Sequence, residues 1–289
     1  MTAAIARLVA LSLSLAAPLA AAAAPAQWRL AGEAQITHKA TLAAFVDEKN
    51  GITAGYAGAM YVTHDGGKTW TPGVNSSACR FGLEALPDGA AWTAGNLGNV
   101  RASTDGGAHW TVAASFGRSE PRHARHLSFL DAKRGLIASQ EELGLTADGG
   151  ESWTKLAVPA KAGMIAAVSL SEEGGGLRIR LLDENGDLWV SADRGASWAQ
   201  APSPLGSPVF ESLTAPRAAM RFTAAGEGVL AAILDEGGLK GHVYRTRDGG
   251  KTWQEEATPG LQPSVLTLSS DARLLTSFDQ YTVRLYRAN

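Results

Sequence analysis

Basic and imidazole side chains gather in one stretch of the sequence, residues 118–126, which reads RSEPRHARH. Guanidinium groups bind carboxylates and phosphates through paired hydrogen bonds, and histidines titrate near neutral pH. One interpretation is a patch for an anionic ligand or partner, with a pH-sensitive contact through the histidines; the other is a solvated basic loop. His123 and His126 have the spacing of a metal-binding pair, but the sequence shows no third ligand. We therefore predict no metal site and no cofactor.

Charge and cysteine content limit the other chemistry that the chain could perform. Lys and Arg number 26 against 28 Asp and Glu, which gives a net charge of −2. This balance gives no overall electrostatic reason to bind nucleic acid or an anionic membrane. The single cysteine, Cys79, cannot form an internal disulfide. No base lies near it in sequence, so we expect a small core residue rather than a nucleophile.

The first 26 residues have the layout of a secretory signal. Arg7 precedes an apolar stretch, residues 8–19, and residues 24–26, Ala-Pro-Ala, give the small-x-small pattern of a signal peptidase site. The apolar stretch is shorter than the roughly 20 residues that a bilayer span needs. We expect cleavage after Ala26, a single domain over residues 27–289, and a periplasmic or secreted location.

Five copies of the pattern Ser/Thr-x-Asp-x-Gly-x-x-Trp organise the chain. Their aspartates and tryptophans are Asp65 and Trp70, Asp105 and Trp110, Asp148 and Trp153, Asp193 and Trp198, and Asp248 and Trp253. Successive aspartates are 40, 43, 45 and 55 residues apart, close to the roughly 40–45 residues of a four-stranded propeller blade. The long last step predicts an insertion in the fifth blade.

Each residue type of this repeat suits a turn between two strands. The Asp carboxylate can accept hydrogen bonds from backbone N–H groups of its own turn, and the Ser or Thr hydroxyl can fix the end of the strand by hydrogen bonding. Glycine allows positive φ, and the Trp ring can cover the turn. A calcium loop would need several oxygen ligands, whereas each repeat offers one carboxylate. The repeats are therefore predicted to be structural turns with no catalytic role.

Short strands separated by turn signals precede each repeat. Three more strands follow the fifth repeat, between residues 264 and 287, and residues 27–30 have the character of the strand that follows a repeat. We infer that this N-terminal strand completes the last blade and closes the ring, which removes an open sheet edge. The prediction is an all-β propeller of six four-stranded blades, with seven blades as the alternative.

This pattern resembles the Asp-box, or BNR, repeat, which was first associated with sialidases. The fuller blade text of residues 91–110 resembles more closely the luminal photosystem II stability and assembly factors and their relatives in non-photosynthetic bacteria. Members of that family look like binding scaffolds without chemistry of their own. The resemblance thus implies a non-enzymatic scaffold for another exported or membrane protein, whose identity stays open. Six blades depart from the seven usual in that family.

The resemblance to sialidases implies a rival function, a hydrolytic or lectin-like glycan-active propeller. Such enzymes need three arginines for a carboxylate substrate, a Tyr nucleophile with a nearby Glu, and an Asp acid. They usually carry an Arg-Ile-Pro segment near the start, which residues 29–46 lack. Tyr56 and Tyr281 are the candidate nucleophiles, and Glu141 or Glu142 could supply an acid.

One face of such a propeller is the predicted recognition surface. With the repeats at the turns between third and fourth strands, the connections between blades and the turns between second and third strands share the opposite face. Loops on a rigid scaffold often carry binding residues. The candidate rim patch comprises Arg80, Arg122, His123, Arg125, His126, Tyr56 and Asn96. A small ligand in the central channel is a further interpretation.

Overall fold

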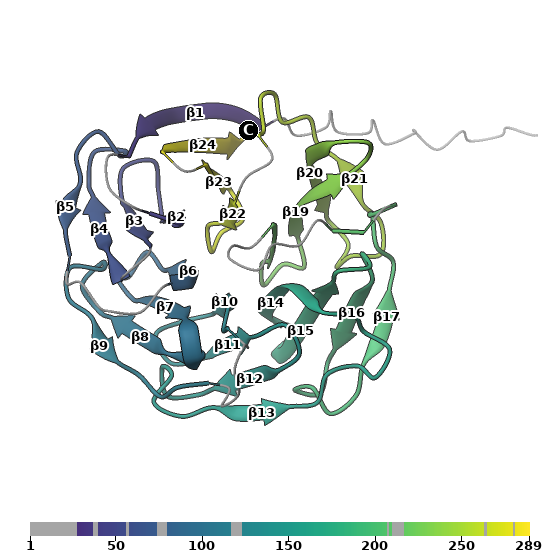
Figure 1. Ribbon diagram of the computed structural model, residues 1–289. Coiled ribbons are helices and arrows are strands. Elements are labelled where there is room, and N and C mark those ends of the chain that lie inside the picture. The colour runs from purple at the N-terminus through teal and green to yellow at the C-terminus, as the bar shows by residue number, and fades with distance from the viewer. Residues whose placement is uncertain are drawn as a thin grey trace, which may run out of the picture.

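The computed structural model describes residues 28–36, 40–55, 58–73, 80–116, 123–206, 208–209, 217–262, 265–279 and 281–289. Within these residues, the strands form six antiparallel four-stranded sheets that stand as blades around a central axis (Figure 1). The predicted all-β propeller of six blades is therefore confirmed, and the alternative of seven is not. No helix in the described ranges is long and apolar enough to cross a membrane.

The blades follow the order of the chain, and the first strand of each lies nearest the axis (Figure 1). Blade 1 contains β2 (Leu42–Phe45), β3 (Gly51–Ala54), β4 (Met60–Thr63) and β5 (Thr71–Pro72). Blade 2 contains β6 (Arg80–Ala85), β7 (Ala91–Gly95), β8 (Val100–Ser103) and β9 (Thr111–Val112), with the short 3-10 turn η2 (Asn96–Gly98) between β7 and β8. Blade 3 contains β10 (His126–Phe129), β11 (Gly135–Ala138), β12 (Leu143–Thr146) and β13 (Thr154–Leu156).

The next two blades are larger. Blade 4 contains β14 (Ile165–Glu173), β15 (Gly176–Asp183), β16 (Leu188–Ser191) and β17 (Ala199–Ala201). Blade 5 contains β18 (Ala218–Phe222), β19 (Gly228–Asp235), β20 (Leu239–Thr246) and β21 (Gln254–Glu255). The insertion predicted for blade 5 is accounted for in part by β19 and β20, which extend to eight residues each.

Blade 6 is assembled from both ends of the chain, as predicted. It contains β22 (Val265–Leu268), β23 (Leu274–Asp279), β24 (Thr282–Ala288) and, on the outside, β1 (Trp28–Gln35). β1 pairs antiparallel with β24 from Trp28 opposite Ala288 to Gln35 opposite Thr282. The buried Trp28 also donates its Nε1–H to Glu256 in blade 5, at 2.7 Å. The N-terminal strand therefore closes the ring and contacts the preceding blade.

A phenylalanine and a glycine six residues later form a recurring contact in blades 1, 3 and 5. The pairs are Phe45 with Gly51, Phe129 with Gly135, and Phe222 with Gly228. A Cβ on these glycines would lie 2.2–2.6 Å from the nearest ring atom, so only glycine lets the ring lie against the second strand. Each ring also meets its own blade's repeat tryptophan edge-on, with centroids 5.8–6.3 Å apart. The Phe-x5-Gly spacing is a core signal that the repeat pattern alone does not reveal.

Candidate functional site

Each repeat forms the turn between the third and fourth strands of its blade, as predicted. In the first repeat, Thr63 Oγ1 accepts the Gly67 N–H at 2.8 Å, and Asp65 Oδ1 accepts the Thr69 N–H at 2.9 Å. Asp65 Oδ2 accepts the Thr69 hydroxyl at 2.6 Å. The same backbone bond to the aspartate recurs in the other four repeats, at Asp105, Asp148, Asp193 and Asp248. These carboxylates are thus engaged within their own turns, which supports a structural role.

The structure spreads the residues of the predicted rim patch over different environments. Tyr56 and Arg122 lie outside the described residues. Arg80 begins β6, but its side chain is not among those described. Asn96 lies in η2, on the face predicted for it. Recognition by this rim stays a prediction.

The second half of the basic stretch is buried rather than exposed. His123 is half-buried beside Phe81, with ring centroids 4.7 Å apart. Arg125 and His126 are 2% and 6% exposed and line a cavity in the central channel. Burial, reinforced by the charge of Arg125, lowers the pKa of His126 to about 3. His126 therefore stays neutral at physiological pH and does not provide the pH-sensitive contact considered above, because it begins the innermost strand β10 instead of lying in a solvated loop.

A buried ion pair crosses the central channel. Arg221 on β18 donates a hydrogen bond from one Nη–H group to Glu84 on β6. It donates another from its second Nη to Ser128 Oγ on β10, at 2.9 Å. The Arg221 and Glu84 side chains are 5% and 7% exposed. The group links blades 5, 2 and 3 and separates a cavity of about 50 Å³ from a wider hollow at one end of the channel. The inner cavity has room for a few waters only, which disfavours a larger ligand inside the channel.

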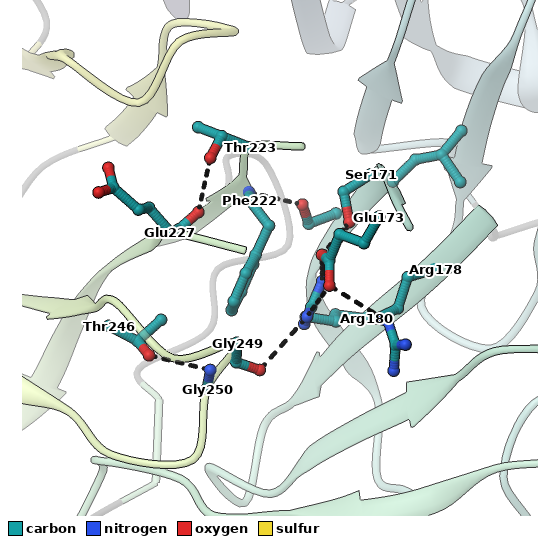
Figure 2. A network of polar contacts seen from close by, with 12 residues as sticks. Ser171, Glu173, Arg178, Arg180, Phe222, Thr223, Glu227, Thr246, Gly249 and Gly250 are labelled. Atoms are coloured by element: carbon teal, nitrogen blue, oxygen red, sulfur yellow. Dashed lines mark hydrogen bonds and ion pairs between the residues drawn. The ribbon is translucent and has the colours of Figure 1, made fainter. Parts of the chain in front are cut away.

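The wider hollow opens on the face that carries the repeat turns, here called the repeat face. Its volume is about 610 Å³, and the turns between the first and second strands of blades 3 to 6 surround it. Figure 2 shows part of its wall, where Arg180 joins blade 4 to blade 5. Arg180 donates to Glu173 at 2.7 Å and to the Gly249 carbonyl at 3.3 Å, and its guanidinium lies 3.6 Å from the Phe222 ring centroid. Because it is 1% exposed, Arg180 is a link between blades and not a cation offered to a ligand.

A second pocket of about 610 Å³ adjoins this hollow where blade 5 meets blade 6. Five arginines line it, and we call it the arginine pocket: Arg29, Arg245, Arg247, Arg273 and Arg287. The pairing of β1 with β24 sets Arg29 opposite Arg287. Arg273 and Glu227 line both the arginine pocket and the hollow. The two features therefore form one groove on the repeat face, opposite the face predicted from the sequence.

The arginine pocket carries more positive than negative charge. Arg245 pairs with the buried Glu256 at 2.7 Å, and Arg287 pairs with Glu48 at 2.6 Å. Arg247 and Arg273 are exposed and form no ion pair with the acidic residues that the structure describes. Exposed guanidinium groups on a rigid wall can bind carboxylates bidentately. The geometry therefore suits an anionic ligand or an acidic polypeptide segment.

Comparison with known families decides what the repeats are. The family described as "BNR/Asp-box repeat" matches residues 61–72 and 244–255, the first and fifth repeats. The first and fifth repeats are Asp boxes. Both matched Asp boxes form the hairpin turns described above, and the other three share their hydrogen bonds.

Solved propellers resemble this chain over most of its length. A structure described as "YCF48 bound to D1 peptide" matches with a TM-score of 0.56 at 18% identity, covering 91% of this chain and 97% of that one. YCF48 from Cyanidioschyzon merolae matches with a TM-score of 0.52 at 16% identity, covering 90% and 98%. PorZ, a surface component of the type-IX secretion system of Porphyromonas gingivalis, matches with a TM-score of 0.51 at 13% identity, covering 82% and 29%. These identities show the fold alone. A comparison with curated protein sequences found no match.

The described candidate catalytic residues of a glycosidase do not line the arginine pocket. Tyr281 is 62% exposed, beside the turn that joins β23 to β24. Glu142 accepts a hydrogen bond from Lys155 Nζ at 2.7 Å on blade 3. The described lining of the arginine pocket contains no tyrosine, and Tyr56 lies outside the described residues. The placement of these residues therefore does not favour the sialidase-like alternative.

The Asp boxes predict a distinct acid lability. Hydrogen bonds from the residue four positions later hold the pKa of Asp65, Asp105, Asp148 and Asp193 at about 2, below the ordinary 3.8. Because the folded state prefers the charged form, this stabilisation is complete above about pH 4 and is lost as the pH falls towards 2. We expect the thermal unfolding midpoint, followed by circular dichroism, to fall steeply over this range. An Asp148→Asn variant should start lower at pH 7 and decline less; an equal decline in both proteins would contradict the prediction.

Proposed function

We propose that this protein is an exported, non-enzymatic scaffold that binds an acidic, extended segment of another exported or membrane protein. The observation that carries the proposal is the arginine pocket, where the guanidinium groups of Arg247 and Arg273 pair with no acidic residue that the structure describes, beside a groove that leads to the channel mouth. The predicted secretory signal supports the exported location.

The fold supports a binding role in two ways. A six-bladed ring is a rigid platform, and the groove is built from turns on one of its faces, where binding residues commonly lie. A solved propeller of similar fold is described as bound to a peptide, the D1 peptide in the case of YCF48. A polypeptide segment is therefore the class of ligand that this groove suits best.

Reversing two charges in the pocket should abolish capture of the partner. A photo-crosslinking residue at Ala288, which lines the arginine pocket, should trap the partner in the exported compartment, and mass spectrometry should identify the trapped segment as acidic. We expect Arg247→Glu with Arg273→Glu to reduce the crosslinked yield at least about tenfold, because each charge-assisted hydrogen bond contributes about 1.5–3 kcal/mol.

A matched control separates local charge from total charge. Lys68 and Lys133 are exposed at turns of blades 1 and 3 on the same face, and changing both to Glu alters the net charge equally. The control should retain the crosslink. An unchanged yield in the arginine variant would refute the proposed binding site, and turnover of a fluorogenic sialoside by the pure protein would refute the non-enzymatic role.

A further inference from the structure

A smaller pocket, of about 240 Å³, lies between blades 1 and 2 on the repeat face. We call it the blade 1–2 pocket. Its apolar wall includes Val46, Ile52, Ala85, Leu86 and Pro87, and its polar edge includes Asp47, Asn50 and His64. It is separate from the arginine pocket, which lies between blades 5 and 6.

The blade 1–2 pocket exists because blade 2 lacks a large apolar side chain that blades 1, 3, 5 and 6 have at the same position. Strand pairing aligns the last ladder position of the innermost strands in blades 1, 2, 3, 5 and 6. These positions hold Phe45, Ala85, Phe129, Phe222 and Leu268. Ala85 is the smallest of the five, and its partner on the second strand is Ala91 where the phenylalanine blades have glycine.

Neighbouring junctions show what normally fills this space. Between blades 2 and 3, Phe129 stacks on Trp92 with centroids 3.5 Å apart and planes 5° from parallel. Between blades 4 and 5, the Phe222 ring lies under the Arg180 guanidinium. At the blade 1–2 junction the equivalents of Trp92 and Phe129 are Ile52 and Ala85. The vacant volume therefore has the place and surroundings of a planar ring.

Hydrogen bonds link Asp47, Asn50 and His64 along the polar edge of the pocket. Asn50 donates its amide N–H to Asp47 at 2.7 Å, and its Oδ1 lies 2.8 Å from His64 Nδ1. Since that oxygen can only accept, Nδ1 of His64 carries the proton, and Nε2 of the neutral ring is an acceptor. Among the described residues nothing bonds Nε2, and the exposed His64 lines the pocket.

We propose that the blade 1–2 pocket binds a planar aromatic ring that carries a hydrogen-bond donor, such as a phenol or an indole. The ring would occupy the space that phenylalanine fills in blades 1, 3 and 5, and its O–H or N–H would donate to His64 Nε2. An apolar cavity of about 150 Å³ holds benzene, so a pocket of 240 Å³ has room for either ring. The source is a free metabolite or a Tyr or Trp side chain of a partner protein.

The direct test is an NMR titration of the purified protein that follows the Ile52 δ1 methyl group. The probes are p-cresol, 3-methylindole and toluene, which has the ring without a donor. We expect saturable ring-current shifts at Ile52, with p-cresol about three- to tenfold tighter than toluene because of one added hydrogen bond. His64→Ala should remove this preference and leave toluene binding unchanged. No shift at Ile52 up to millimolar p-cresol would overturn the proposal.

A second variant fills the pocket from within. Ala85→Phe combined with Ala91→Gly rebuilds the phenylalanine and glycine pair of blades 1, 3 and 5. We expect this protein to unfold at a higher temperature and to bind p-cresol at least tenfold more weakly, while crosslinking at the arginine pocket is unchanged. If it does not fold, Ile52→Trp fills the same space from blade 1, with binding then followed on the backbone amide of Ala90. Undiminished p-cresol binding by a folded filled variant would overturn the proposal.

The source of the ring can be read from a further probe. N-acetyl-tyrosine amide carries the phenol on a capped backbone. Binding as tight as that of p-cresol would assign the pocket to a side chain of a partner protein, and its exclusion would assign the pocket to a free small molecule. Both results retain the aromatic class, provided that the His64→Ala variant weakens binding.

Discussion

Replacing Arg221 with methionine is expected to lower the free energy of unfolding by about 3–5 kcal/mol, the usual cost of leaving one partner of a buried ion pair uncompensated. Arg221 is the sole described cation that pairs with the buried Glu84 across the channel. Without it, the buried Glu84 carboxylate has no described cation to pair with. Chemical denaturation at pH 7, with the midpoint and slope fitted together, measures the loss.

The stability lost in the Arg221→Met variant should depend on pH and on the presence of the Glu84 carboxylate. Burial already raises the pKa of Glu84 above the ordinary 4.5 despite the Arg221 charge, and the variant should raise it further. A raised pKa in the folded state means that stability declines as the pH rises above about 4.5, so the defect should be smaller at pH 5 than at pH 8. Glu84→Leu with Arg221→Met should recover most of the loss, because an apolar pair of similar volume carries no buried charge. A double variant as unstable as the single one would contradict this account.

Replacing Trp28 with alanine is expected to lower the free energy of unfolding by about 3–5 kcal/mol, the range for truncating a buried aromatic side chain. Trp28 is 1% exposed, and its Nε1–H bonds to Glu256, which also accepts from Arg245. The change removes packing between blades 5 and 6 and a bond that fixes the closing strand. Thermal and denaturant unfolding of the purified variant and wild type measure the loss of stability.

Two further variants locate the cause. Leu30→Ala changes a side chain on the same strand that is 50% exposed, and its effect should stay within about 0.5 kcal/mol. Trp28→Phe keeps most of the apolar packing but loses the bond to Glu256, and it should fall between alanine and wild type. Equal stability of the Trp28→Ala and Leu30→Ala proteins would show that β1 contributes little to closing the ring.

The architecture could be predicted from the sequence because its signals are local or repeated. Each Asp box places its turn-forming residues within eight positions, so Thr63 and Asp65 specify their hairpin without reference to the rest of the fold. The spacing of the boxes then gives the blades. The closing strand was also predictable, because residues 27–30 look like the strand after a box and the last blade lacked one.

The arginine pocket could not be read from the sequence in the same way. Arg29 and Arg287 are brought together by the register of β1 on β24, and Arg273 joins them through a turn of blade 6. No single stretch of the chain is rich in arginine there. Applying the β1 register to the predicted closure is the one step that would have paired Arg29 with Arg287 beforehand.

Side-chain burial could not be predicted where local composition and position in a blade disagree. Arg125 and His126 lie in a basic stretch, which favours a solvated loop, but they lead into an innermost strand and face the channel. The blade 1–2 pocket was equally hidden, because Ala85 is an ordinary strand residue until it is aligned with Phe45 and Phe129 through strand pairing.

The make-up of blade 6 from both ends of the propeller imposes an order on how the chain reaches its native state. β1 emerges first, yet Trp28 must find Glu256, 228 positions later, and pair with β24, which is made last. Bringing such distant segments together carries an entropic cost and slows folding. Five blades can form one after another as their strands become available, whereas the sixth must wait for β24, the last strand of the ring. A chain that lacks β24 would therefore leave β1 unpaired, and its open last blade would be exposed to proteases.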